Sequence, residues 1–364
     1  MNGNTLRVGS GEFGPGRPLI IAELGTGHGG EAAKARDLCD AAVEAGADCV
    51  KFQIVYADEI LHPNTGDVAL PGGTIRLYDR FKELEMPPEF FRYMKEYAEK
   101  RGLLFLCTPF GMRSAAELRA LEPQFVKIAS PELNYTALLR ELAGWGLPIL
   151  LSSGVSKLAD IEEALGLLAG VPVCLLHCVT AYPAPETDYN LRVLGSLAGV
   201  FGVPVGISDH SRDPELIPAL GTALGAAVIE KHFCLRREDK GLDDPIALPP
   251  DDFARMVRAI RAAGAGTIAS YRRERGAALV EAILGDGVKR LAPSERANYE
   301  RTNRSLHALR DIAAGERIWP ADFAVLRTEK VLRPGLPPSW AERISGRTAR
   351  HPIPAGEGIR FEDV

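Results

Sequence analysis

The stretch from Val205 to Phe233 decides the fold, because two short apolar segments in it flank a helical run. It begins with VGISDHS at 205–211 and ends with AAVIEKHF at 226–233. Short apolar runs with β-branched residues predict buried strands, and buried strands that alternate with helices are typical of parallel α/β sheets. Each run ends in a polar cluster with a histidine, His210 in the first and His232 in the second.

The same alternation repeats through the first 265 residues. Eight apolar segments begin near Pro18, Asp48, Leu103, Phe125, Pro148, Val173, Pro204 and Ala226, and helical patterns occupy 31–45, 88–101, 113–121, 135–146, 157–169, 190–201, 213–224 and 251–263. Eight strand–helix units over roughly 250 residues predict a TIM (β/α)₈ barrel. A doubly wound open sheet is the alternative, but it normally carries a G-x-G-x-x-G loop, which residues 25–30 (GTGHGG) do not match.

Three segments fall outside this repeat. Residues 1–17 are glycine-rich and predict a loose leader, and residues 54–87 predict a long turn-rich loop of the kind that forms lids. From about Gly285 the chain turns polar and aperiodic. The last 60 residues repeat a pattern loosely, in DIAAGERIWPADF near Asp311 and HPIPAGEGIRFEDV at the end. We therefore expect a barrel domain at 1–285, a linker at 286–303 and a small, mostly β domain at 304–364.

Composition and charge exclude several classes of protein. The 364 residues are 46% hydrophobic and 25% charged, with a formal net charge of −5, which argues against a nucleic-acid or anionic-membrane surface. No apolar run reaches the ~18 residues of a membrane span, and the first residues lack the apolar core of a signal peptide. The six cysteines are scattered without a C-x-x-C pair. These features predict a cytoplasmic protein with free thiols.

Polar side chains gather at the carboxyl ends of the predicted strands, where a TIM barrel places its chemistry. In chain order they include Glu23, Lys51, Gln53, Lys127, Ser130, Glu132, Ser152, Thr180, Tyr182, Ser208 and Glu230. A lysine in a buried strand needs an anion, so Lys51 and Lys127 with nearby serines predict a cradle for phosphate or carboxylate. Lys231 adjoins His232 and should point to the opposite face of its strand.

The two histidines predict a metal site, although each could instead cap its strand. Imidazole ligands with nearby carboxylates and open positions suit Mn²⁺ or Mg²⁺ better than closed tetrahedral zinc. Two mechanisms fit a lysine-rich barrel mouth. A lysine could form a Schiff base with a carbonyl substrate, as in pyruvate aldolases, or lysines could hold an anion while a metal polarises an aldehyde. We prefer the second, and a non-catalytic sugar-binding barrel is a third interpretation.

Eight motifs carry a resemblance to a known family. In order they are E-L-G-x-x-H-x-G, A-G-A-D-x-V-K-F-Q, C-T-P-F, K-I-A-S-x-E, L-S-S-G, H-C-x-x-x-Y-P-x-P, S-D-H-S and I-E-K-H-F. Together they resemble the sialic-acid synthase family (the N-acetylneuraminate, pseudaminate and legionaminate synthases) over residues 18 to about 265. The final 61 residues resemble that family's antifreeze-like (SAF) domain through N-R-S-L, D-I-x-x-G-E and L-R-P-G.

The resemblance implies a metal-dependent transferase that condenses phosphoenolpyruvate with an N-acylated amino-hexose aldehyde, either N-acetylmannosamine or a 6-deoxy diacetamido hexose. The product would be a nine-carbon 2-keto sugar acid, with phosphate released. It also implies a domain-swapped homodimer, in which Arg304 of one subunit reaches the acyl group of the sugar in its partner's barrel.

The resemblance further implies a role for each residue at the mouth. His210 and His232 would bind Mn²⁺, Mg²⁺ or Co²⁺, and phosphoenolpyruvate would be held by Lys51, Lys127, Ser130, Ser152 and Ser208. The sugar or the attacking water would face Glu23, Gln53, Tyr182 and Asp243. Glu23 or Glu132 would stabilise positive charge on the reacting carbon, and Thr180 and Glu230 would complete the substrate-binding set.

Several positions depart from the family pattern. Gly27 and Gly29 replace two asparagines, Gly111 replaces an aspartate after C-T-P-F, and Asp244 and Ala247 replace a histidine and a serine. After His177 and Cys178, Val179 and Thr180 keep one hydroxyl of the usual pair. The groups expected to bind phosphoenolpyruvate and metal are intact, whereas those on the sugar side are altered. The sequence therefore predicts the reaction type and leaves the acceptor sugar open.

Overall fold

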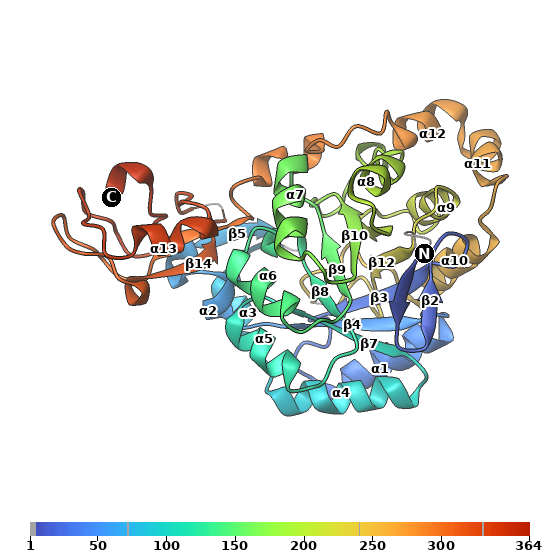
Figure 1. Cartoon of the computed structure of the whole chain (residues 1–364). Coiled ribbons are helices and arrows are strands. Elements are labelled where there is room, and N and C mark those ends of the chain that lie inside the picture. The colour runs from blue at the N-terminus through green and yellow to red at the C-terminus, as the bar shows by residue number, and fades with distance from the viewer. Residues whose placement is uncertain (1–4, 71–72, 240, 330) are drawn as a thin grey trace.

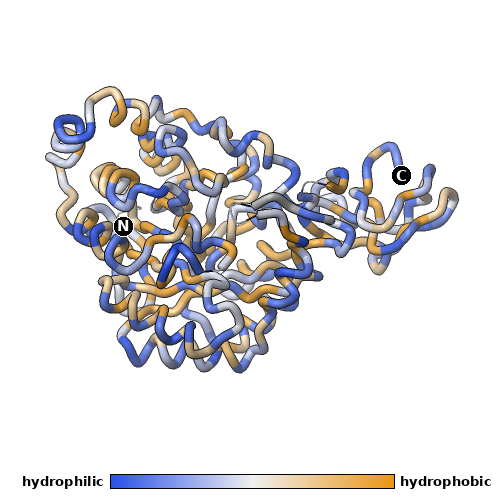
Figure 2. The backbone as a smooth tube through the Cα atoms, turned by 180° about the vertical axis from the view of Figure 1, so that it is seen from behind, coloured by the Kyte–Doolittle hydropathy of each residue, from blue (hydrophilic) through white to orange (hydrophobic). Residues whose placement is uncertain are grey.

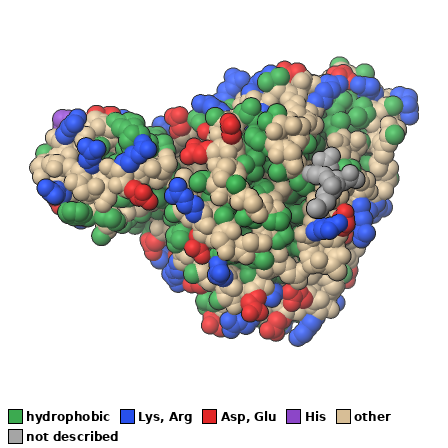
Figure 3. All heavy atoms as spheres, in the orientation of Figure 1, with side chains coloured by type: hydrophobic (Ala, Val, Ile, Leu, Met, Phe, Trp, Pro, Cys, Tyr) green, Lys and Arg blue, Asp and Glu red, His purple; other side chains and the backbone are tan. Residues whose placement is uncertain are grey.

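The computed structural model describes residues 5–70, 73–239, 241–329 and 331–364, which form a large barrel lobe and a smaller C-terminal lobe (Figure 1). The first four residues of the expected leader, and Pro71 and Gly72 of the LPGG turn, lie outside the described residues. On the face shown in Figure 3, basic and acidic side chains are interspersed over both lobes.

An eight-stranded parallel sheet confirms the predicted TIM barrel. Its order is β7-β4-β3-β12-β11-β10-β9-β8, and β7 lies beside β8 at the seam. The strands are β3 (Leu19–Gly25), β4 (Cys49–Ile54), β7 (Leu104–Pro109), β8 (Val126–Ile128), β9 (Ile149–Ser152), β10 (Val173–Cys178), β11 (Val205–Asp209) and β12 (Val228–His232). Each strand begins within two residues of the expected position, because a strand buried on both faces can be recognised from its apolar residues alone.

Helices cover the outside of the barrel. They are α1 (Ala32–Glu44), α4 (Pro88–Lys100), α5 (Met112–Arg119), α6 (Thr136–Ala143), α7 (Leu158–Leu167), α8 (Val193–Phe201), α9 (Leu216–Ala223) and α10 (Pro250–Ala262), followed by α11 (Thr267–Arg275) and α12 (Ala277–Leu284). Over the described part of the chain, no helix has both the length and the apolarity needed to cross a membrane.

Alternation along the strands separates an apolar core from a polar mouth. In β3, Leu19 and Ile21 face into the barrel and pack in its interior, and Glu23, the next residue on that face, lines the cavity at the mouth. The residues between them, such as Ile20 and Ala22, pack against the helices. In Figure 2, apolar and polar stretches alternate along the chain in both lobes. The period of two therefore keeps Glu23 on the inward face of its strand, and its place near the carboxyl end of the strand puts it at the mouth.

The expectation of a loose leader was wrong. Residues 6–13 form an antiparallel hairpin of β1 (Leu6–Val8) and β2 (Gly11–Phe13). Leu6, Val8 and Phe13 are buried among the inward-facing residues of the strands. The hairpin closes the amino-terminal end of the barrel, and its three-residue strands are too short for a clear periodic signal.

The long loop after β4 is also more ordered than predicted. It contains α2 (Ala57–Ile60), the 3₁₀ turn η1 (Pro63–Thr65), the hairpin β5 (Asp67–Leu70) and β6 (Gly73–Arg76), and α3 (Leu77–Glu83). Ile60, Leu61 and Leu77 form a small core with Val55 and Phe110. This core attaches the loop to the barrel mouth.

The C-terminal lobe is built from β13 (Arg304–Ala308) and β14 (Phe323–Arg327), the 3₁₀ turns η5 (Pro320–Asp322), η6 (Pro338–Trp340) and η7 (Phe361–Asp363), and α13 (Ala341–Ile344). The two echoed sequence segments lie side by side, since Ile312 pairs with Ile353 in an antiparallel bridge. Both isoleucines are buried in the lobe's own core. The internal repeat thus corresponds to two strand-like pieces that cover one core.

Glu59 explains the glycine at position 111. Its carboxylate accepts hydrogen bonds from the backbone N–H groups of Arg113 (2.5 Å) and Ser114 (3.0 Å), in the first turn of α5. A Cβ at Gly111 would lie 2.5 Å from Cδ of Glu59. The capping carboxylate that an aspartate at 111 would supply therefore comes from α2 instead.

This exchange predicts a specific rescue. Glu59→Ala should lower the free energy of unfolding by about 1 kcal/mol, because α5 loses its cap. Gly111→Asp alone should also destabilise the fold, because its side chain meets Glu59. The double variant should recover most of the loss in denaturant unfolding, whereas Glu96→Ala, an exposed control, should change it by less than about 0.5 kcal/mol. Additive losses in the double variant would contradict the exchange.

Candidate active site

A cavity of about 340 Å³ lies at the carboxyl ends of the strands. Most of the predicted site residues line it, namely Glu23, Lys51, Gln53, Lys127, Ser130, Ser152, Thr180, Tyr182, Ser208, His210, Glu230, His232 and Asp243. They come from strands β3, β4, β8, β9, β11 and β12, and from the segments that follow β8, β10, β11 and β12. Strand-end position had marked most of this set, whereas Asp243 was named only through the family resemblance.

Two lysines and two glutamates form the floor of the cavity. Lys51 Nζ lies 2.9 Å from Glu23 Oε2 and 3.8 Å from Glu230 Oε2, and Lys127 Nζ lies 3.6 Å from Glu230 Oε1. All four side chains are at most 6% exposed. Ser208 donates to Glu230 Oε1 at 2.8 Å. These contacts hold the two ammonium groups at the cavity floor, where an anionic ligand would meet both.

Burial and charge pull the pKa values of the floor in different directions. Burial alone would raise the pKa of Glu230, but Lys127 and Lys51 outweigh it and lower that pKa to about 2. Burial raises the pKa of Glu23, and Lys51 opposes it only in part. Burial lowers the pKa of Lys127, whereas Glu23 and Glu230 outweigh burial at Lys51 and raise its pKa. Glu230 is thus a fixed anion, and Glu23 is the more basic carboxylate.

Unpartnered hydroxyls face the same space. Ser152 Oγ and Thr180 Oγ1 are buried and have no hydrogen-bond partner among the described residues. Both residues line the cavity close to Ser130, whose Oγ accepts from the backbone N–H of Gly154. Buried hydroxyls without partners are costly, so they indicate that a ligand with acceptor oxygens belongs here.

His210 and His232 lie together on one side of the cavity, with ring centroids 5.4 Å apart. Nδ1 of His210 is 2.9 Å from the carbonyl oxygen of Val179, so Nδ1 carries the proton of a neutral ring and Nε2 keeps its lone pair. Nδ1 of His232 lies 3.7 Å from Asp243 Oδ2. Burial lowers the pKa of His232 to about 4, against the opposing effect of Asp243, so its ring is neutral at pH 7.

Cys178 affects the other imidazole. Its Sγ lies 3.8 Å from Nδ1 of His210. Burial would lower the pKa of His210, but the thiolate form of Cys178 outweighs burial and raises that pKa to about 9. A cation bound at His210 would therefore have to displace a proton, which makes binding stronger as the pH rises.

The two histidines fit a divalent metal with an open coordination sphere. Among the described residues, no cluster of three or more His, Cys, Asp or Glu side chains is arranged to hold a metal. A metal at His210 and His232 would thus need water or substrate oxygens for its other positions, as in catalytic rather than structural sites.

Two predicted site residues lie elsewhere. Glu132 and Arg304 do not line the cavity, because each is buried in contact with the other. Glu132 Oε1 accepts from Arg304 Nη2 at 2.8 Å and from Arg327 Nη2 at 2.7 Å. Arg304 also donates to the carbonyl oxygens of Phe110 and Glu59. Glu132 therefore anchors the C-terminal lobe to the barrel and does not face a reacting carbon.

Arg304 docks on the barrel of its own chain. Its guanidinium is fully buried against its own barrel, so in this arrangement it does not reach another subunit's sugar. The domain-swapped homodimer itself stays a prediction.

Lys231 confirms the parity argument, because its Nζ is 2.6 Å from Asp209 Oδ2 and 2.6 Å from the carbonyl oxygen of Ser211, away from the cavity.

Sequence reasoning missed two groups of cavity residues. One is an apolar wall of Leu77, Phe81, Phe110, Leu242, Pro245 and Ile246. The other comes from the C-terminal third of the chain, namely Asn298, Thr302, Arg327 and Glu329. Phe110 and Cys178 lay within quoted motifs, but no local pattern marks Arg327, which reaches the cavity only because its lobe docks there.

Comparison with known proteins gives the family. The NeuB family matches residues 38–267, and the SAF domain matches residues 303–364. The chain belongs to the NeuB family. It is an enzyme of the class that forms C–C bonds in nonulosonic acid biosynthesis, with a TIM barrel and a C-terminal SAF domain.

Three relatives cover nearly all of the chain. The spore coat polysaccharide biosynthesis protein SpsE of Bacillus subtilis has a solved structure with a TM-score of 0.81 and 32% identity, covering 99% of both chains. The pseudaminic acid synthase of Campylobacter jejuni is 33% identical over 95% of this chain and 96% of its own. The N,N'-diacetyllegionaminic acid synthase of Legionella pneumophila is 30% identical over 95% and 94%.

The buried contact between Glu132 and two arginines predicts a large effect of neutralisation. Glu132→Gln should lower the free energy of unfolding by about 3 kcal/mol, because two guanidinium groups lose their carboxylate in a dry interface. Protease should also cleave the 286–303 segment faster. Glu141→Gln removes a carboxylate from a surface pair 3.8 Å long and should change stability by less than about 0.5 kcal/mol. Equal effects of the two variants would contradict the anchoring role.

Proposed function

We propose that this NeuB-family enzyme condenses phosphoenolpyruvate with an N-acylated amino-hexose aldehyde and, as phosphate leaves the intermediate, forms a nine-carbon 2-keto sugar acid. One observation carries the proposal. The buried lysines Lys51 and Lys127 and two unpartnered hydroxyls line the same cavity as the imidazoles of His210 and His232. The first set suits a phosphorylated carboxylate, and the second set suits the cation that an aldehyde acceptor needs.

The floor of the cavity gives each chain group a task. Lys51, Lys127 and the Ser130, Ser152 and Ser208 hydroxyls would hold the carboxylate and phosphate of phosphoenolpyruvate, and orient its carbon 3 toward the aldehyde. When that bond forms, positive charge develops at carbon 2. The carboxylate of Glu23 would stabilise this charge, and its raised pKa suits it to take a proton from the water that adds there. Phosphate then leaves from the tetrahedral carbon.

His210 and His232 would hold a divalent metal, Mn²⁺, Mg²⁺ or Co²⁺. Such a metal polarises an aldehyde oxygen when it is bound. Tyr182 stacks on His210 with ring centroids 4.3 Å apart, which fixes one wall of the site. Asp243 and Gln53 supply hydrogen-bonding groups for the sugar; Gln53 already donates to Glu23 Oε1 at 2.6 Å.

The apolar wall points to the acceptor. Leu77, Phe81 and Ile246 offer no partner to a hydroxyl but can cover methyl groups. A 2,4-diacetamido-2,4,6-trideoxy hexose has three methyl groups, whereas N-acetylmannosamine has one and carries a 6-hydroxyl. The departures at Asp244 and Ala247 lie outside the cavity lining, so they do not restore polarity to this wall. We therefore propose the 6-deoxy diacetamido hexose as the acceptor.

An acceptor panel tests this function. Phosphate release from phosphoenolpyruvate is measured with N-acetylmannosamine and with 2,4-diacetamido-2,4,6-trideoxy hexoses. The trideoxy sugars should give a kcat/KM at least about tenfold higher, the ratio expected when about two buried methyl groups separate the substrates. Phe81→Ser should reduce that ratio. No phosphate release with any acceptor would contradict the function, and a preference for N-acetylmannosamine would contradict only the acceptor.

A second candidate, a Schiff-base aldolase, is favoured by the lowered pKa of Lys127. Metal removal separates the two. Under our proposal, chelation or His232→Ala should reduce kcat by at least about a hundredfold, because several kcal/mol of charge stabilisation are lost. Borohydride with pyruvate should leave Lys127 unmodified by mass spectrometry. Trapping at Lys127 together with full activity in chelator would favour the aldolase.

A further inference from the structure

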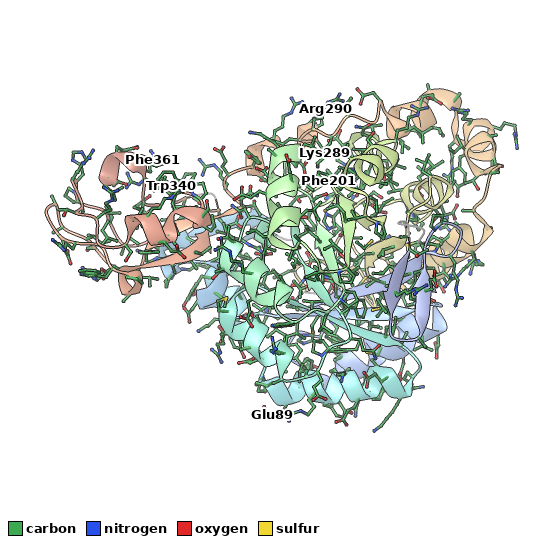
Figure 4. The ribbon with its side chains drawn as sticks, viewed as in Figure 1. Glu89, Phe201, Lys289, Arg290, Trp340 and Phe361 are labelled. Carbon is green, nitrogen blue, oxygen red and sulfur yellow. The ribbon has the colours of Figure 1, made fainter. Side chains whose placement is uncertain are left out.

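A second cavity, of about 360 Å³, lies outside the barrel between the end of β10, the start of α8 and residues 282–296. It shares a wall with the active cavity. Side chains alternate along β10 and the residues after it, so Cys178 and Thr180 line the active cavity, whereas His177 and Val179 line the second one. Figure 4 labels Lys289 and Arg290 on the segment that borders this second cavity.

His177 brings an unused hydrogen-bond acceptor to the wall of the cavity. The residue is only 4% exposed, and its Nε2 lies 2.6 Å from the carbonyl oxygen of Tyr189. Nε2 must therefore carry the proton, which leaves a lone pair on Nδ1. That atom is buried and has no partner among the described residues. Burial lowers the pKa of His177 to about 3, so the ring is neutral and accepts an O–H or N–H donor.

Lys289 brings a cation with hydrogen bonds to spare. Its Nζ donates to the carbonyl oxygen of Ser153 at 3.1 Å, and within the described ranges no carboxylate forms an ion pair with it. Burial lowers the pKa of Lys289, and the nearby carboxylate of Glu295 opposes that shift only in part. Arg296, which also lines the cavity, makes no ion pair with any described residue.

The carboxylates of the cavity are already engaged. Glu295 accepts from the backbone N–H groups of Ala292, Val155 and Thr180 at 2.9–3.0 Å. Asp188 accepts from the N–H of Ser294, and Asp286 pairs with Arg290 at 2.7 Å. The cavity formally holds three cations and three anions, but Lys289 and Arg296 are the cations left for a ligand.

We propose that the second cavity binds a small hydroxylated anion, either a sugar acid or a sugar phosphate, and that its occupancy changes the rate of the reaction in the barrel. The anion would pair with Lys289 and Arg296, and a hydroxyl would donate to Nδ1 of His177. The binding part stands by itself; only the rate part rests on the proposed function.

Direct bonds connect the two cavities. Glu295 lines the second cavity and holds the backbone N–H of Thr180, whose side chain lines the active one. Lys289 holds the carbonyl oxygen of Ser153, which follows the active-site residue Ser152. An anion that draws Lys289 toward itself competes with that carbonyl and shifts the wall where phosphoenolpyruvate would sit.

Calorimetry on the full-length protein tests the site. The probes are glucuronate as a sugar acid and glucose 6-phosphate as a sugar phosphate, with glucose and inorganic phosphate as controls. At least one probe should bind with a Kd on the order of 1 mM, and more tightly than either control. Lys289→Met should weaken it at least about tenfold, the loss of one charge-assisted bond. Lys95→Met, on α4, should change nothing.

Two further variants keep the outcomes distinct. His232→Ala changes only the active cavity and should leave probe binding unchanged. If Lys289→Met does not fold, Arg296→Ala replaces it and should weaken probe binding. Three outcomes would each contradict the site. The first is no probe binding up to about 10 mM, and the second is an unchanged affinity in both second-cavity variants. The third is loss of probe binding in His232→Ala. Phosphate release that is unaffected by saturating probe would contradict the rate effect alone. An enzyme that releases no phosphate would contradict the proposed function, while the titrations still decide the site.

Discussion

The central constraint on this structure is the burial of two ammonium groups side by side. Lys51 and Lys127 lie inside the barrel, where an unpaired cation would be far too costly. Glu23 and Glu230 offset this cost, and Ser208 holds Glu230 in position. The barrel brings four strands together so that these charges meet at one height, above a cluster of buried apolar side chains.

A second buried charge cluster joins the two lobes. Glu132 sits at the barrel mouth, and the two arginines that bind it both come from the small C-terminal sheet. The same docking carries Arg327 to the active cavity, so the geometry of the site depends on how the lobe is seated. Asn134 reinforces the seating by bonding both the N–H and the carbonyl oxygen of Arg304. The residues that line the cavity and those that join the two lobes are therefore one connected structure.

Much of this could be predicted from the sequence, for one reason. Buried parallel strands show as apolar runs, and their period of two tells which polar residues at the ends share a face. That argument separated Lys231 from His232 and placed Lys51 with Gln53. It did not apply to Glu132, because this residue follows its strand in a 3₁₀ turn, η2 (Ser130–Glu132), where the period of two is lost.

Contacts between distant segments account for the remaining differences. Glu59 and Gly111 look unrelated in sequence, and only their meeting at the start of α5 shows that one replaces the other's missing carboxylate. Arg327 reached the cavity through a docking of lobes that no local pattern encodes. The β1–β2 hairpin was missed because its strands hold three residues each, and their burial depends on the barrel that they close.

The β1–β2 hairpin also has a kinetic consequence. Because it closes the amino-terminal end of the barrel, any ligand of the cavity must enter and leave through the other end. There the path runs between the barrel strands and the β14 side of the small lobe. The last reactant to enter therefore covers those that entered before it, and the order of binding and release follows from depth in the barrel. Under the proposed function, the phosphorylated substrate held by the lysines at the floor would enter before the sugar, and phosphate would leave after the sugar acid has moved aside.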